Sequence, residues 1–218
     1  MSTDTKQVVT EEKPVEEKPV EEKPVEEPAA KPAAKPAAKP AAKPAAKPAA
    51  KPVELPAFEK SISDNVVENF GDKIQVEFVK ENRVGIKVNR EDVHDVAEFI
   101  RDGLNYDHVE SVSGVDYPQD KEIEVVYHIG SYSDSSLAKQ ILVLATRAQR
   151  EENPIPGKDA TKLPTLRDIF YSVEFHEREV FEMFGVYFTG HPDNRRLLLP
   201  EDWADLPPLR KDFAIKGR

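Results

Sequence analysis

The residues best suited to chemistry are concentrated in one stretch, 176–203, which reads HEREVFEMFGVYFTGHPDNRRLLLPEDW. Its 28 residues include six carboxylates and five arginines or histidines. Glu179, Glu182 and His191 form the set that could hold a metal ion, and two of the carboxylates could act as general acid and general base. The stretch therefore offers three functions to compare: metal binding, acid–base catalysis and a charged docking surface.

The spacing of these residues argues against a metal site. Di-iron helical bundles use a Glu-x-x-His step on each of two helices. Here the step is Glu179-x-x-Glu182, and His191 lies beyond a glycine. The one Glu-x-x-His step in the chain, from Glu91 to His94, falls on a different predicted helix. We therefore assign no metal ligand in this chain.

Catalysis by the carboxylates is also disfavoured. An acid–base pair needs a pocket that moves two pKa values apart, and Arg178 beside the acids would tend to hold them ionised. The sequence has no nucleophile elbow and no dinucleotide-binding glycine motif. It has no cysteine, which excludes a cysteine nucleophile and a Cys-ligated cluster within the chain. We predict no catalytic residue.

The same charges suit a structural or docking role. On a helix, Glu174, Arg178 and Glu182 lie four residues apart, and this spacing predicts intrahelical ion pairs of about 0.3–0.5 kcal/mol each. After Gly190, arginines alternate with leucines and Trp203, which is typical of an extended segment lying across a partner. A tail folded back onto its own domain fits the sequence equally well.

Hydrophobic periodicity predicts the elements that must position this stretch. Apolar residues recur at every fourth position from Phe58 to Phe70, ahead of Gly71, and predict a helix with one apolar face. Alternation predicts a β-hairpin over 73–89, and a second amphipathic helix over 90–104 takes Asn89 as its N-cap.

Three strands and a third helix follow. Strands are predicted over 108–117, 121–129 and 138–148, and the nearly continuous apolar run in the last of them suits a central strand. Thr165 and Asp168 resemble a capping box at the start of a helical stretch that ends at Gly185. This order predicts an α+β fold: a mixed β-sheet with helices packed on one face, followed by an extended C-terminal tail.

The chain divides into three predicted regions. Residues 1–53 repeat EEKPV three times and KPAA five times, so we expect a disordered Pro/Lys/Glu/Ala-rich arm. Residues 54–190 form the α+β domain, and 191–218 form the docking tail. The net charge is −10, and residues 1–52 contribute +1, so the remainder carries −11 and is a poor candidate for binding nucleic acid. No secretory signal or apolar membrane span is visible.

The charged stretch closely resembles the signature of the 30 kDa subunit of respiratory complex I, which is also known as the C subunit of NADH-quinone oxidoreductase. The matching residues are Glu177, Arg178, Glu179, Glu182, Met183, Phe184, His191 and Arg195, with RRLLLPEDW over 195–203 and PLRKDF over 208–213. Upstream, VDYP and EVVYHI are also similar to the family. Two departures, Glu182 in place of the common Asp and Leu206-Pro207 in place of Gly-His, leave the branch of the family open.

The resemblance implies a subunit of the hydrophilic arm of a proton-translocating quinone oxidoreductase, without flavin or cluster of its own. NADH or another donor, flavin, iron–sulfur clusters and quinone would belong to partner subunits. It implies contact with the quinone-site (49 kDa-type) subunit and with iron–sulfur subunits, and a peripheral place at the cytoplasmic face of the cell membrane, reached only through the complex. The residues expected to brace the domain or its interfaces are Glu177, Arg178, Glu179, Glu182, His191, Arg195, Arg196, Trp203, Arg210, Lys211 and Asp212.

Two alternatives remain open from the sequence. One is a subunit of a related membrane-bound hydrogenase, because related domains occur there. The other is a free-standing enzyme that uses the acid cluster, which would require a closed pocket around Glu179, Glu182 and His191.

Overall fold

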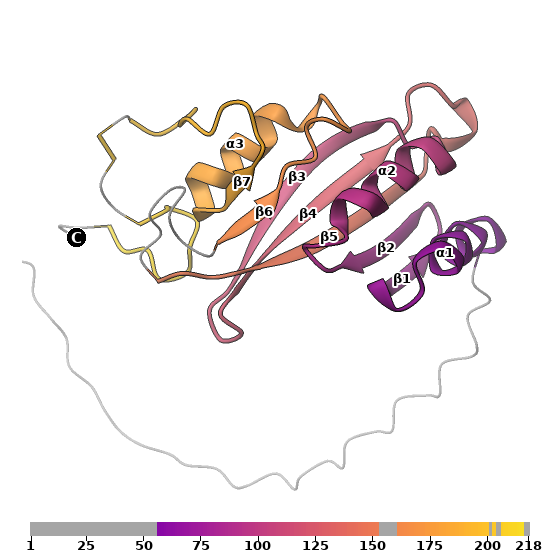
Figure 1. Ribbon diagram of the computed structural model, residues 1–218, viewed down its shortest axis with the longest axis horizontal. Coiled ribbons are helices and arrows are strands. Elements are labelled where there is room, and N and C mark those ends of the chain that lie inside the picture. Colours follow the sequence, from indigo (N-terminus) through magenta and orange to yellow (C-terminus); the bar gives the residue numbers. More distant parts are fainter. Residues whose placement is uncertain (1–55, 153–160, 201, 204–205, 216–218) are drawn as a thin grey trace, which may run out of the picture. The chain divides into compact units, whose positions relative to one another are not determined.

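The computed structural model describes residues 56–152, 161–200, 202–203 and 206–215 (Figure 1). The arm predicted over 1–53 lies outside these residues, and the predicted boundaries at 54 and 191 stay predictions. Among the described residues, no helix is both long enough and apolar enough to cross a membrane.

A five-stranded sheet forms the centre of the domain. Its order is β1-β2-β5-β4-β3, with β2 and β5 parallel and every other neighbouring pair antiparallel. The central strand is β5, as the apolar run predicted, and the sheet is mixed. The strands are β1 Ile74–Lys80, β2 Arg83–Val88, β3 His108–Tyr117, β4 Glu122–Gly130 and β5 Ile141–Gln149.

Three helices cover one face of this sheet (Figure 1). They are α1 Ala57–Phe70, α2 Val93–Leu104 and α3 Val173–Phe184. Their apolar residues form one core with alternate residues of the strands, such as Ile123, Val125 and Tyr127 of β4. Val143 and Ala145, which point to the other face, are buried but lie outside this core. The predicted α+β class is confirmed.

Short elements complete the domain. The sequence did not indicate the parallel pair formed by β6, Lys162–Pro164, and β7, Tyr187–Thr189. This pair flanks α3 in the chain and brings the residues before the helix beside those after it. Single 3-10 turns lie at Gly71–Lys73 and Ser135–Leu137.

Two predicted helix caps are wrong. The second helix begins at Val93, and Asn89 accepts the backbone N–H of Asp92 through its carbonyl oxygen instead of capping with its side chain. The third helix begins at Val173, eight residues after Thr165, whose hydroxyl instead donates to Glu177. Turns over 166–172 replace the expected first turns because they bury Leu166 and Phe170 in the core.

The first helix is also rotated relative to its predicted face. Phe58 is 47% exposed, whereas the neighbouring Glu59 is buried. The Oε1 atom of Glu59 accepts hydrogen bonds from Gln140 Nε2 at 2.9 Å and from the Asn82 amide at 2.7 Å. The bond from Gln140 is the largest cause that lowers the pKa of Glu59. A buried polar anchor at the β1–β2 turn therefore outweighs the burial of one phenylalanine.

The third helix approaches the sheet most closely at Gly114 of β3. A Cβ atom at this position would lie 2.5 Å from the ring of Phe184, the last residue of α3. Phe184 is itself buried in the core, so its ring has little room to move. The absence of a side chain at residue 114 thus sets how near α3 can lie to β3.

We predict that Gly114→Ala lowers the free energy of unfolding by about 1–3 kcal/mol, the usual cost of overpacking a core. Urea denaturation measures it. Shortening the opposing ring with Phe184→Leu in the same chain should recover part of the loss, giving a coupling energy in a double-mutant cycle. A Gly114→Ala variant as stable as the parent chain would contradict this account of the contact.

Candidate functional site

The charged motif of α3 is divided between the interior and the surface. Glu177 faces the sheet and has 0% exposure. Its Oε1 atom accepts from the Tyr127 hydroxyl at 3.1 Å and from the Leu166 amide at 2.9 Å. Its Oε2 atom accepts from the Thr165 hydroxyl at 2.5 Å. The carboxylate thus fastens α3 to strand β4 and to the segment that follows β6.

Burial and hydrogen bonding act on Glu177 in opposite directions. Burial disfavours the charged form and raises the pKa of Glu177 to about 7, while the three donated hydrogen bonds partly oppose this change. Burial is the larger effect: among the described residues no Lys or Arg forms an ion pair with this carboxylate, and His191 Nε2 is 3.9 Å away. The His191 ring accepts from the Asp193 amide at Nδ1 and contacts the Glu174 carbonyl at Nε2, so the neutral Nε2–H tautomer fits its surroundings.

Glu182 holds the C-terminal tail by its backbone. Its carboxylate is only 5% exposed and accepts from three consecutive amides. The distances are 3.0 Å from Leu197, 2.7 Å from Leu198 and 3.1 Å from Leu199. Hydrogen bonds from backbone N–H groups to a carboxylate are charge-assisted and stronger than neutral ones. This contact fixes the path of the chain directly after Arg196.

Arg178 fixes the same segment from the neighbouring turn of α3. Its guanidinium donates to the carbonyl oxygens of Arg195 and Arg196, both at 3.0 Å, and lies 3.5 Å from Asp193. The predicted intrahelical pairs are therefore wrong, because Arg178 bonds to the tail and Glu174 pairs with Arg167 at 3.1 Å. Groups outside the helix are therefore the partners of Arg178 and Glu174 in the fold.

The remaining predicted residues near α3 lie at the surface. Glu179 is exposed, and within the described part of the chain it makes no hydrogen bond or ion pair. Arg195 is 85% exposed and forms a two-point contact with Asp193, at 2.8 and 2.9 Å, which lowers the pKa of that carboxyl. Arg196 donates to the carbonyl oxygens of Pro200 and Trp203.

The end of the tail is attached at a second place, the end of the sheet. Arg210 is buried and donates to the carbonyl oxygens of Phe184 and Glu151. Asp212 pairs with Arg150 at 2.7 Å, and the Lys211 amide donates to Asp116. Trp203 packs 6.0 Å from Phe213, centroid to centroid. These observed contacts are within the chain, and the roles of the predicted residues at a partner stay predictions.

Several residues of the site were not identified from the sequence. They are Tyr127, Thr165, Asp116, Arg150 and Asp193. Asp116 is buried and bonds Arg150 at 2.6 Å, next to the tail. In the sequence, Asp116 stands out only as a single acid within the predicted strand segment VDY. The tertiary fold is needed to identify Arg150 as its partner.

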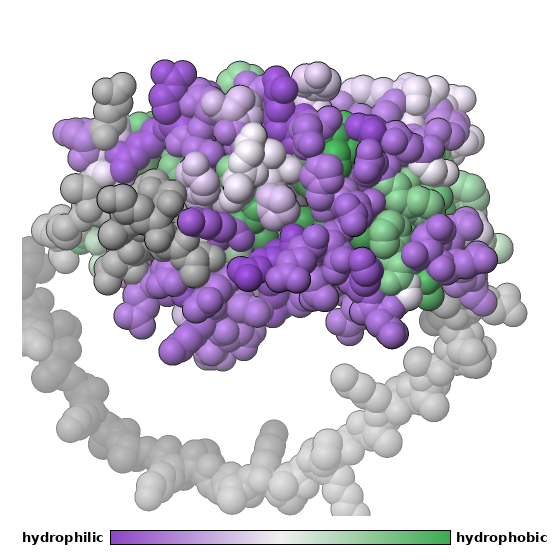
Figure 2. All heavy atoms as spheres, viewed as in Figure 1, coloured by the Kyte–Doolittle hydropathy of each residue, from purple (hydrophilic) through white to green (hydrophobic). Residues whose placement is uncertain are grey.

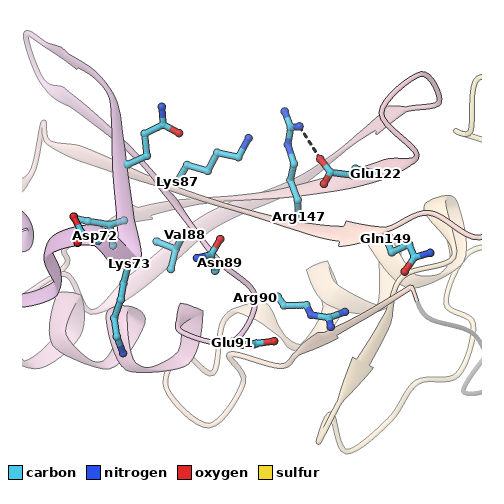
Figure 3. A pocket seen from close by; sticks show the side chains of 12 residues that line it. Asp72, Lys73, Lys87, Val88, Asn89, Arg90, Glu91, Glu122, Arg147 and Gln149 are labelled. Atoms are coloured by element: carbon cyan, nitrogen blue, oxygen red, sulfur yellow. Dashed lines mark hydrogen bonds and ion pairs between the residues drawn. The ribbon is translucent and has the colours of Figure 1, made fainter.

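Two open grooves lie beside these contacts. The larger, about 660 Å³, lies at one end of the sheet and mixes Lys73, Lys87, Arg90 and Arg147 with acidic side chains such as Glu122, which pairs with Arg147 at 2.8 Å (Figure 3). The smaller, about 530 Å³, lies between α3 and the tail. Its lining residues are Arg178, Phe181, Asn194, Arg195, Arg196 and Leu199. No group of three or more His, Asp or Glu within the described ranges could hold a metal ion.

Comparisons with known proteins agree on one family. Residues 86–218 match the family model described as respiratory-chain NADH dehydrogenase, 30 Kd subunit. The C subunit of an NADH-quinone oxidoreductase from Chlorobium phaeobacteroides is 34% identical over 156 residues, covering 70% of this chain and 87% of that protein. The C subunit of the F(420)H(2) dehydrogenase from Methanosarcina mazei is 35% identical over 131 residues, covering 60% of this chain and 75% of that protein.

A solved structure has a similar fold. A chain of the membrane-bound sulfane sulfur reductase, an archaeal respiratory membrane complex, matches with a TM-score of 0.57 and 27% identity. The match covers 72% of this chain and 86% of that one. The family match includes α3 with Glu177 and Glu182, and the tail.

We predict that Glu182→Gln loosens the tail, because the amide nitrogen of glutamine would face an N–H donor. Loss of about 1.5–3 kcal/mol of charge-assisted bonding should speed hydrogen exchange of the amides at 197–199 by at least about tenfold. Exchange measured by mass spectrometry checks this. Glu179→Gln is the matched control, since Glu179 is exposed on the same helix. Equal exchange in both variants would remove Glu182 from this role.

We predict a pH dependence of stability that comes from Glu177. Its pKa rises from 4.5 to about 7 on folding, so the folded state retains a proton that the unfolded state has lost. The contribution is fully present below about pH 4.5 and is lost as pH rises to about 7. At about 1.4 kcal/mol per pKa unit, the loss reaches about 3 kcal/mol at most.

Urea denaturation at pH 5 and pH 8 tests this contribution. The parent chain should lose stability over this interval relative to Glu177→Gln, which does not titrate. All other titrating groups are shared and cancel in the difference. Parallel curves for the two chains would show that Glu177 stays ionised throughout the range.

Proposed function

This chain belongs to the family of the 30 kDa subunit of respiratory-chain NADH dehydrogenase, and from this premise we propose that it is a bracing subunit of the hydrophilic arm of a proton-translocating quinone oxidoreductase. In this role it carries no cofactor and no catalytic residue. It holds the quinone-site subunit and the iron–sulfur subunits in place while electrons pass to quinone through its partners.

The observation that supports this role is how the charged motif is used. Glu177 and Glu182, the two buried acids of α3, accept six hydrogen bonds from groups of the same chain. Their oxygens are turned to the helix–sheet contact and to the tail, so a substrate has no direct access to them. Acids bonded in this way stabilise the contacts of α3 with the sheet and with the tail. A subunit that holds its neighbours in place requires such a stable fold.

The proposed partners follow from the family. They are the quinone-site (49 kDa-type) subunit and the iron–sulfur subunits of the connecting arm, which would carry the clusters, while flavin, donor and quinone sites lie elsewhere in the complex. We place the chain at the cytoplasmic face of the cell membrane, attached through the complex. Arg195, Arg196 and Lys211, together with Trp203, are the tail residues proposed to contact these partners.

The electron donor is set by other subunits in this proposal. The relatives named above belong to an NADH-quinone oxidoreductase and to an F(420)H(2) dehydrogenase, and the similar solved chain belongs to a sulfane sulfur reductase. One type of subunit in complexes with different names supports a scaffold role that does not depend on the donor. A membrane-bound hydrogenase would use the same scaffold with other neighbours.

We predict that the tagged full chain, purified from gently solubilised membranes, brings with it a quinone-site subunit and iron–sulfur subunits. Mass spectrometry of the purified material measures this and also identifies the donor-binding subunits. The matched control is an untagged strain carried through the same purification. Recovery of the chain alone from the soluble fraction, with a metal bound in stoichiometric amount, would instead support a free-standing enzyme based on the acid cluster.

A further inference from the structure

We propose that the surface formed by α3 and the adjoining tail binds an acidic segment of a neighbouring subunit, whose carboxylate enters the groove between them. We call this surface the α3–tail face. It consists of Tyr171, Phe175, Arg178, Arg195, Arg196 and Leu198. The proposal rests on the bracing function above and adds to it a specific surface and the chemistry of its occupant.

The first support is a set of large apolar side chains exposed beside arginines. Tyr171 is 74% exposed, Phe175 is 58% exposed and Leu198 is 60% exposed. Phe175 lies outside the core, to which α3 contributes Val173, Val180 and Phe181. Aromatic and arginine side chains are enriched in the parts of interfaces that carry binding energy. Tyr171 lies in the turn before α3, Phe175 lies on α3, and Leu198 lies in the tail segment that Glu182 holds against α3.

The second support is the groove itself. Its lining brings three guanidinium groups together, those of Arg178, Arg195 and Arg196, with Asn194 and two apolar residues. No acidic side chain is among the described residues that line it. Asp193 makes a two-point contact with Arg195 and lies 3.5 Å from Arg178, so one described carboxylate is already shared by two of these guanidinium groups. This contact illustrates how well arginine N–H donors match a carboxylate. A volume of about 530 Å³ admits one or two side chains of a partner.

Local charge supports an acidic occupant. The chain outside its first 52 residues carries a net charge of −11, whereas the three arginines that line the groove outnumber Asp193, the acid that pairs with two of them. A basic groove of this kind attracts an acidic segment, while the like net charges of two copies of this chain oppose self-association. The exposed aromatic and leucine side chains favour a protein over a phosphate group, because they need apolar contacts around the charge.

The α3–tail face is better suited than the other exposed areas. Figure 2 shows an apolar area at the right of the view, where α1 lies, and Phe58 and Val67 of α1 are exposed. Neither of the two grooves described above is lined by a residue of α1. The groove at the end of the sheet mixes four basic residues with three acidic ones. Neither of these two areas therefore indicates which chemical class of partner would bind there.

The arginines of the α3–tail face are held in position before any partner arrives. Arg178 is tied to two tail carbonyls, and Glu182 fixes the amides on either side of Leu198. Little side-chain entropy would therefore be lost when a partner carboxylate binds. This order explains how an exposed groove could bind its occupant firmly.

We predict that a photo-crosslinking residue placed at Phe175 or at Leu198 joins the chain to an Asp- or Glu-containing segment of another subunit in the intact complex. The same residue at Glu98, on the exposed side of α2, is the control and should not reach that segment. Peptide mapping by mass spectrometry identifies the product. Crosslinks to lipid, to a second copy of the chain or to a segment without acids would overturn the proposal.

A charge reversal tests the role of the groove. Tagged Arg195→Glu, expressed beside the untagged parent chain, should enter the complex about tenfold less than a tagged parent chain, since it repels the proposed carboxylate. Arg90→Glu makes the same change of charge at another exposed arginine and is the matched control. Thermal unfolding of each purified chain separates a folding defect from a binding defect.

The outcomes distinguish this proposal from the bracing function. If the parent chain purifies without partners, the bracing function fails. If the parent chain assembles and Arg195→Glu assembles as well as Arg90→Glu, the bracing function stands and the α3–tail face is not the acidic docking site.

Discussion

Carboxylates removed from water must be hydrogen-bonded, and the architecture around α3 follows from this constraint. Glu177 draws the Tyr127 hydroxyl, the Thr165 hydroxyl and the Leu166 amide to one point, while Glu182 draws three tail amides to another. Substituting one acid would leave several buried donors unsatisfied at once. The segments before and after α3 therefore depend on this helix for their position.

Patterns of apolar residues predicted the sheet, its central strand and all three helices, because burial of alternating or fourth-position residues is a local signal. They failed where a polar contact across the fold decided the outcome. Glu59 is buried in place of Phe58 because Asn82 and Gln140 supply donors from distant parts of the chain. Thr165 was assigned to a helix cap because its true partner, Glu177, lies 12 positions along the chain, beyond the reach of a local capping rule.

The site shows the same division. Residue types and spacing identified the charged motif, yet they predicted contacts along the helix. In the fold, Arg178 and Glu182 both turn to the tail, since backbone groups held beside the helix are better partners than flexible side chains on it. Asp116 and Arg150 illustrate the limit of sequence reasoning, because 34 positions separate two residues that form one ion pair.

The charged motif is divided between the interior and the surface, and this division explains how so many charges can serve the bracing role proposed above. Glu177 fastens α3 to the sheet, and Glu182 sets the path of the tail that carries Arg195 and Arg196 to the groove. An interface arranged in this way loses less conformational entropy on binding than a flexible tail would. In the docking proposed above, Glu182 would contribute without touching the partner, by fixing the tail segment next to the arginines.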